Sequence, residues 1–223
     1  NAMHGLINVV LPKPGEAGSI RLESGPRGTY RANAKLGSQH GDFSHILLIN
    51  GMNEDGYQAD SGVDQQKASW LYTYNMDNGV SLDGGLTAIN LNQETGGYIV
   101  GSNSYKDEVA RKANPNPEAH RDSKNHRVWT TISADTANWS LNITPYWREV
   151  NMNFMQHFLP GKPVEDFQHQ TFGIQSAGYR TLNNGAELSV GFDFEDTSAS
   201  LLQFQANATE GSFFLRNSIP QGK

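Results

Sequence analysis

The strongest constraint in the sequence is a strict alternation of apolar and polar residues from position 139 to position 147. Trp139, Leu141, Ile143, Pro145 and Trp147 occupy one set of alternate positions, and small or polar residues with one tyrosine occupy the other. Side chains on a β-strand point to opposite faces in turn, so this segment predicts a strand with one apolar and one polar side. Similar alternation recurs at 30–36, 68–76 and 188–195, whereas a helical period is suggested only for a short helix at 106–113.

The spacing of these segments predicts an all-β protein. We expect nine strands, at about 18–25, 28–38, 42–51, 65–76, 79–92, 125–135, 137–150, 168–181 and 185–196. Short turns at 38–41, 77–79, 135–137 and 183–185 alternate with long connections at about 52–64, 93–124 and 151–167 and after 196. This alternation is typical of an antiparallel up-and-down meander that forms a β-barrel, or part of one, with about 8–10 strands and its long loops at one end.

Composition removes several classes of protein. Cysteine is absent, which excludes a disulfide framework and thiol catalysis, and a net charge of −6 makes a nucleic-acid partner improbable. The longest apolar run is Ile46–Ile49, far short of the ~20 residues that a membrane-spanning helix needs. A membrane β-barrel is not excluded, because its strands alternate apolar and polar residues and keep the mean hydropathy low.

Two residues on the 139–147 segment add detail. Trp139 and Trp147 stand near the two ends of its apolar side, roughly 26 Å apart at ~3.3 Å per residue, and the apolar band of a membrane barrel is about 25 Å tall between aromatic girdles. Pro145 has no N–H to give to a neighbouring strand, so we expect a local interruption of the ladder there.

The N-terminal stretch N-A-M-H-G-L-I-N-V-V-L-P-K resembles the end of the plug domain of TonB-dependent outer-membrane receptors. Ala2, Gly5, Ile7, Asn8 and Lys13 match the motif A-x-x-G-x-I-N-x-x-x-K, with a short extension before the lysine. Asn1 and Ala2 also fit a cloning remnant, and the sequence leaves that choice open.

Two further stretches are similar to the same family. Residues 18–38 resemble the first barrel hairpin, and Gly211–Lys223 resembles a surface-loop segment that runs into a further strand. The resemblance implies residues 1–14 as the end of a plug and 15–223 as a barrel segment.

The resemblance also implies a function. The parent protein would be an outer-membrane receptor of a Gram-negative cell that takes up a ferric siderophore or another metal chelate, coupled to the TonB complex through a more N-terminal part. The long loops would be extracellular, the apolar strand face would meet the lipid bilayer, and the segment itself would not carry out transport. No enzymatic activity, cofactor or resident metal is expected.

Candidate ligand-binding residues come from the two longest internal connections. Aromatic and arginine side chains can stack on and neutralise an anionic metal chelate, and histidines can contact its metal. The candidates are Tyr98, Tyr105, Arg111, Arg121, His126 and His157. The alternative is that they are solvated loop residues, since no two histidines have the spacing of a metal site.

Two other interpretations remain open from the sequence. One is a free-standing lipocalin-like barrel that binds a small apolar ligand. The other is a fragment that closes on itself with eight or nine strands and its apolar face inward. Both place Trp70, Leu141, Ile143, Val190 and Phe192 inside, whereas a membrane receptor places them outside. Unpaired edge strands of a fragment would also favour self-association.

Overall fold

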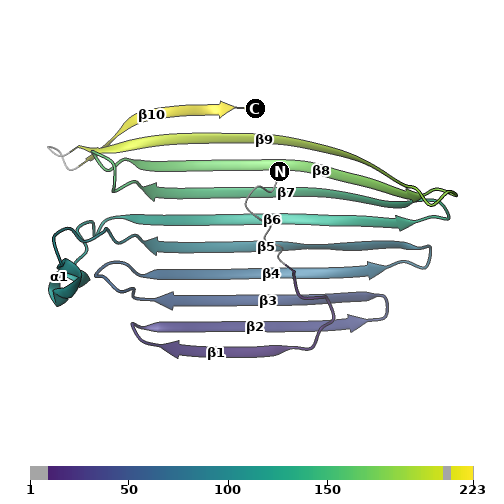
Figure 1. Ribbon diagram of the computed structural model, residues 1–223, viewed down its shortest axis with the longest axis horizontal. Helices are drawn as coiled ribbons and strands as arrows, with labels where there is room; N and C mark the ends of the chain where they lie inside the picture. The colour runs from purple at the N-terminus through teal and green to yellow at the C-terminus, as the bar shows by residue number, and fades with distance from the viewer. Residues whose placement is uncertain (1–9, 208–211, 223) are drawn as a thin grey trace.

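The computed structural model describes the backbone of residues 10–207 and 212–222 and the side chains of residues 10–205. Its strands form one antiparallel sheet in which each strand lies beside its neighbour in sequence (Figure 1). They are β1 (Ser19–Gly25), β2 (Thr29–His40), β3 (Phe43–Glu54), β4 (Val63–Asn75), β5 (Val80–Glu94), β6 (His120–Asp135), β7 (Ser140–Met155), β8 (Val164–Thr181), β9 (Glu187–Asn207) and β10 (Ser212–Gly222). The predicted all-β meander is confirmed.

The connections separate into two ends, as the sequence predicts. Short turns join β2 to β3, β4 to β5, β6 to β7 and β8 to β9 at the right of Figure 1, and the longer loops, with the helix α1 (Glu108–Lys112), lie at the left. Gly79 and Gly185, in the two predicted Asn-Gly turns, have φ angles of 79° and 81°. A residue with a Cβ is strained at such angles, so glycine fits these turns.

The sheet does not close on itself. Within the described residues, β1 pairs with β2 alone and β10 pairs with β9 alone. The partial-barrel form of the prediction is therefore the one observed, and the self-closed form is absent from the described part of the chain. The two outer strands leave backbone donors and acceptors free along both edges of the sheet.

The strands run further toward the loop end than the sequence predicted. β6 begins at His120 instead of 125, and β9 continues to Asn207 where a long connection after 196 was expected. Residues 212–222, predicted as surface loop, form the tenth strand. On β6 the prediction was wrong because both faces of the strand carry polar residues at this end, such as Arg121 and Asp122, so no alternation signals the strand.

The predicted interruption at Pro145 is confirmed on one side. Toward β8 the pairing is continuous, with Pro145 opposite Ile174. Toward β6 it is interrupted between Ile143 and Tyr146, and the register is the same on both sides of the gap. A missing N–H explains a local loss of pairing without a shift of register.

One face of the sheet, here called the banded face, carries the apolar sides predicted at 30–36, 68–76, 139–147 and 188–194, and apolar residues of the other strands from β1 to β8 continue it. Register aligns Leu36, Leu47, Trp70, Leu86, Val128, Trp147 and Phe172 in one row across seven strands. Side chains on this face are largely solvent-exposed in the open sheet; Phe192 is 65% exposed and Val190 is 58% exposed. An apolar face of this extent requires something other than water to cover it.

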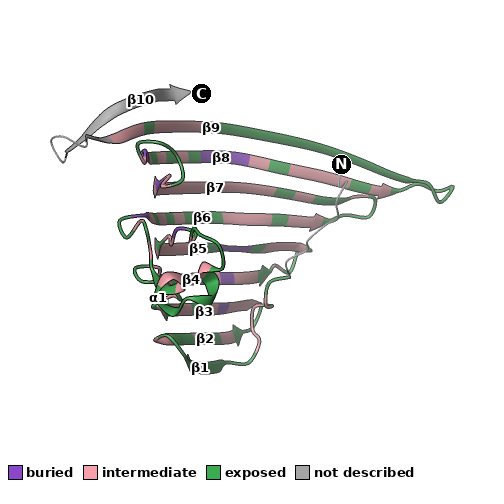
Figure 2. Cartoon of the chain, turned by 60° about the vertical axis from the view of Figure 1, so that its left-hand side comes forward, coloured by how far each residue is buried: buried purple, intermediate pink, exposed green. Residues whose placement is uncertain are grey.

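The opposite face holds most of the buried side chains of the strands. Ile46, Ser69, Leu71 and Thr171 are buried there, and Figure 2 shows that most other strand residues are intermediate or exposed. The segment before β1 also lies against this face. Glu16 accepts a hydrogen bond from Lys35 Nζ at 2.5 Å, and this bond is the first cause of its lowered pKa.

A glycine on the opposite face gives a test of the register. A Cβ at Gly173 would overlap the ring of Tyr146, whereas a Cβ at Gly51, on the banded face, meets nothing within 4 Å. We expect Gly173→Ala to lower the free energy of unfolding by about 1–3 kcal/mol, the cost of overpacking. Urea unfolding of the two variants checks this, with Gly51→Ala neutral or slightly stabilising; equal effects would contradict the register.

Candidate functional site

Two loops at the long-loop end are joined by a set of hydrogen bonds. The Gln58 side-chain amide donates to the carbonyl oxygens of Gly97 at 2.9 Å and Ala113 at 3.0 Å. Asn114 Nδ2 donates to the Asp60 carbonyl at 2.8 Å, and the Ala59 N–H donates to Lys112 at 2.8 Å. The loop at 55–62 therefore fixes the position of the loop at 95–119.

The helix α1 in the second of these loops is short and well capped. The Asp107 carboxylate accepts hydrogen bonds from the backbone N–H groups of Ala110 at 3.0 Å and Val109 at 2.9 Å, and these two bonds lower its pKa. Glu108 pairs with Lys112 at 2.9 Å one turn later, which lowers the pKa of Glu108. These contacts, with the ion pair of 3.8 Å between Glu108 and Arg111, hold Arg111 in place in the last turn of the helix.

Arg111 lines a hollow of about 440 Å³ between the two loops, together with three tyrosines, Tyr57, Tyr98 and Tyr105. We call it the tyrosine–arginine pocket. The tyrosines are 52%, 72% and 63% exposed, so their rings are open to a ligand. The Arg111 Nε is buried and has no hydrogen-bond partner among the described residues. A cation beside open aromatic rings suits an anionic, partly planar ligand.

The pocket joins three of the six predicted ligand-binding residues, Tyr98, Tyr105 and Arg111. It also contains Tyr57, which the prediction omitted because Tyr57 lies outside the two longest internal connections, the source of the candidates. The sequence signal that could have identified Tyr57 is an aromatic residue within the predicted long connection at 52–64.

Arg121 and His157 belong to a second group at the same end of the sheet. The Arg121 guanidinium lies 4.5 Å from the ring centre of Phe154, and the rings of Phe154 and Phe158 are 6.3 Å apart. The His157 ring is 5.7 Å from that of Phe158. Arg121 lies in β6 and not in a loop, which corrects the predicted location.

His126 is separate from both groups. It also lies in β6, on the banded face, with its Nδ1 3.7 Å from Glu149 Oε2 on β7. The sequence placed it near the start of a strand that in fact begins six positions earlier, at His120. Its position therefore associates it with the sheet surface and not with the loop pocket.

An ion pair links the remaining long loop to the first two. Lys162, in the loop after β7, lies 2.5 Å from Glu118 and lowers the pKa of that carboxyl group by its hydrogen bond. In the described part of the chain no group of three or more His, Asp or Glu side chains could hold a metal ion. None of the described helices has the length and apolar character needed to cross a membrane.

The apolar band drifts steadily along the strands. The row of paired residues that begins at Leu22 on β1 reaches the polar residues Gln66 on β4, Lys124 on β6 and Gln168 on β8. On these three strands the apolar run lies nearer the short turns. Ile20 is level with Ser198 on β9, where the apolar run is Leu188–Phe194. The centre of the run moves by about 8 positions, roughly 27 Å over about 38 Å of sheet. A level band therefore needs strands tilted by about 35°, as in membrane barrels.

Aromatic residues mark both borders of the band on β7. Trp139 lies at the short-turn border, beside Gly178 and with the Arg180 guanidinium 5.8 Å from its ring centre. Trp147 stands at the loop-side border, opposite Val128 and Phe172. This agrees with the predicted spacing of the two tryptophans. The band is flanked as a bilayer-facing surface would be.

Among known proteins, only solved structures match this chain. No family model matches the sequence, and no curated protein does. Among solved structures, the ferric citrate transporter FecA in its unliganded form is similar over 92% of this chain, with a TM-score of 0.73 and 14% identity. The siderophore receptor PiuA from Acinetobacter baumannii is similar over 94%, with a TM-score of 0.67 and 13% identity. The pyoverdine outer membrane receptor FpvA from Pseudomonas aeruginosa is similar over 95%, with a TM-score of 0.66 and 11% identity.

These likenesses show a shared fold. This chain spans about a third of each of the three structures, 31%, 34% and 33% respectively. By name, the three neighbours are a ferric citrate transporter, a siderophore receptor and a pyoverdine outer membrane receptor.

The cap of α1 predicts a pH effect on the pocket. Because its hydrogen bonds lower the pKa of Asp107, its stabilising effect is complete above the ordinary pKa of about 3.8 and is lost as the pH falls through the lower, folded value. At neutral pH, Asp107→Ala should speed amide exchange in 104–113, and Asp77→Ala, in a turn at the other end, should not. The difference between Asp107→Ala and the unchanged chain should vanish in strong acid; a difference that persists there would contradict the role of the carboxylate.

Proposed function

We propose that this chain is part of an outer-membrane receptor that takes up a ferric siderophore or another anionic metal chelate in a Gram-negative cell. The observation that carries the proposal is the tilted apolar band. Its slope matches the strand tilt of a membrane barrel, and the other face of the sheet holds most of the buried side chains of the strands. The likeness in fold to ferric-chelate receptors supports the same conclusion.

In this proposal the banded face meets lipid and the opposite face lines the interior of a longer barrel. Residues 1–14 are the end of a plug. The chain that follows them lies on the interior side, as the hydrogen bond between Lys35 and Glu16 indicates. The plug links the receptor to the TonB complex. Residues 1–9 lie outside the described part of the chain.

The ligand binds at the long-loop end, which is extracellular in this orientation. The tyrosine–arginine pocket supplies a cation with an unpartnered Nε and open aromatic rings, although Glu108 lies 3.8 Å from the Arg111 guanidinium. The Arg121 group supplies a second cation on an aromatic ring. Charge neutralisation and stacking are the interactions that an anionic chelate offers. The loops act as a binding surface, and no enzymatic step is assigned to them.

Neighbouring positions on β7 separate the two faces in one experiment. Ile143 is on the banded face and Asn142 is on the other. We expect Ile143→Lys to reduce the free energy of folding into lipid vesicles by about 2–4 kcal/mol, as a lysine does at the bilayer midplane, and Asn142→Lys to change it little. Urea titration in vesicles measures both. A larger cost for Asn142→Lys would reverse the assignment of the faces.

Solubility separates this function from the lipocalin-like alternative. The refolded chain should aggregate without detergent and give a defined peak with it, because the banded face remains exposed. Size-exclusion chromatography with light scattering shows which occurs. A sharp monomeric peak without detergent would contradict the membrane orientation.

The pocket predicts a loss of ligand affinity on removal of its cation. Ferric citrate and a ferric tris-catecholate serve as probes in equilibrium dialysis of the chain in detergent. Arg111→Gln should weaken binding by about tenfold or more, since a charge-assisted contact is worth about 1.5–3 kcal/mol. Arg180→Gln, at the short-turn end, is the matched control. Equal affinities for the two variants would exclude the pocket as the site.

A further inference from the structure

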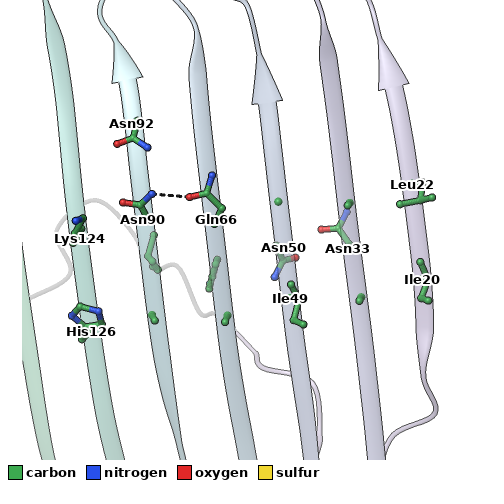
Figure 3. Close-up of a pocket in the computed structure, with 17 residues that line it drawn as sticks. Ile20, Leu22, Asn33, Ile49, Asn50, Gln66, Asn90, Asn92, Lys124 and His126 are labelled. Carbon is green, nitrogen blue, oxygen red and sulfur yellow. Dashed lines mark hydrogen bonds between the residues drawn. The ribbon is translucent and has the colours of Figure 1, made fainter.

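A shallow groove crosses the banded face from β1 to β6 and has a volume of about 720 Å³ (Figure 3). Small residues form most of its floor on four neighbouring strands, and Ile49 of β3 stands between Ala34 and Ala68. The small residues are Ala32, Ala34, Gly51, Ala68 and Ala88. Larger apolar residues stand around it, including Ile20 and Leu22 on β1. The groove lies on the face that the proposed function turns to lipid.

The groove lies at the loop-side border of the apolar band. Toward the short turns it is followed by the apolar row of Leu47, Trp70 and Leu86. Toward the loops its rim is polar, and in Figure 3 Asn90 donates to Gln66 at 2.7 Å across two strands. An apolar floor that ends in a polar rim matches the join between an acyl chain and its headgroup.

The rim also carries an available positive charge. Lys124 lines the groove and forms no ion pair with another described residue. His126, next to it on the same face, lies 3.7 Å from Glu149. Asp122 and Asp64 stand one row nearer the loops and do not line the groove. The Lys124 ammonium group is therefore free to meet an anion.

We propose that the groove binds one phosphate-bearing lipid of the surrounding membrane, with an acyl chain on the alanine and glycine floor and the phosphate beside Lys124. This inference rests on the membrane orientation proposed above. An acyl chain fits because each methylene removed from water contributes to binding, and a lysine near the surface adds attraction for an anionic headgroup. The polar rim amides face the glycerol and ester groups.

Native mass spectrometry of the refolded chain in a neutral detergent tests the site, with phosphatidylglycerol as the probe and dioleoylglycerol as its uncharged counterpart. The double variant Ala68→Leu/Ala88→Leu fills the floor, and Ala134→Leu is its control on the same face near the short turns. Lys124→Gln removes the charge, and Lys106→Gln, in the loop, is its control.

The double variant Ala68→Leu/Ala88→Leu should weaken phosphatidylglycerol binding by about tenfold. This is the loss expected when about two methylene groups of the acyl chain are no longer buried in the groove. Lys124→Gln should weaken it by about fivefold and leave dioleoylglycerol binding unchanged. Equal binding by the filled and control variants would overturn the groove as a lipid site, and equal binding by Lys124→Gln and Lys106→Gln would overturn the phosphate contact. A chain that needs no detergent would instead refute the proposed function, so the two failures are distinguishable.

Discussion

The consecutive antiparallel ladder is the constraint on which the rest of this structure depends. Because each strand pairs with the next in sequence and the described pairings from β1 to β9 keep register, every side chain is assigned to one face by its position alone. A slip of one residue in any strand would exchange the two faces of that strand. The apolar band, its drift and the groove in it are consequences of this single arrangement.

The two ends of the sheet differ in the surface that they present. Tight turns leave the short-turn end with little surface, and Trp139 with Arg180 closes the band there. At the other end the loops contact one another through Gln58, Asn114 and the ion pair between Lys162 and Glu118. Rigid loops on a rigid wall place Arg111 and the tyrosines before a ligand arrives, which reduces the entropy lost on binding.

Much of the fold could be predicted from the sequence, and less of the site. Alternation at 139–147 and the Asn-Gly turns predicted strands, faces and the order of short and long connections, because these depend on local periodicity. The loop-side start of β6 near Asp122 and the strand after 211 lacked that signal. Tyr98, Tyr105 and Arg111 were chosen by residue type, but their meeting with Tyr57 depends on hydrogen bonds between loops, which no local pattern encodes.

The four tryptophans give the most direct test of which face meets lipid. Trp70, Trp139 and Trp147 are on the banded face, and Trp129 is on the other, where it lies against Gly85. Variants that each retain one tryptophan, with phenylalanine at the other three positions, can be refolded into vesicles of brominated lipid, which quenches fluorescence on contact. The account predicts strong quenching of Trp70, Trp139 and Trp147 and little quenching of Trp129. Quenching of Trp129 as strong as that of the other three would contradict it.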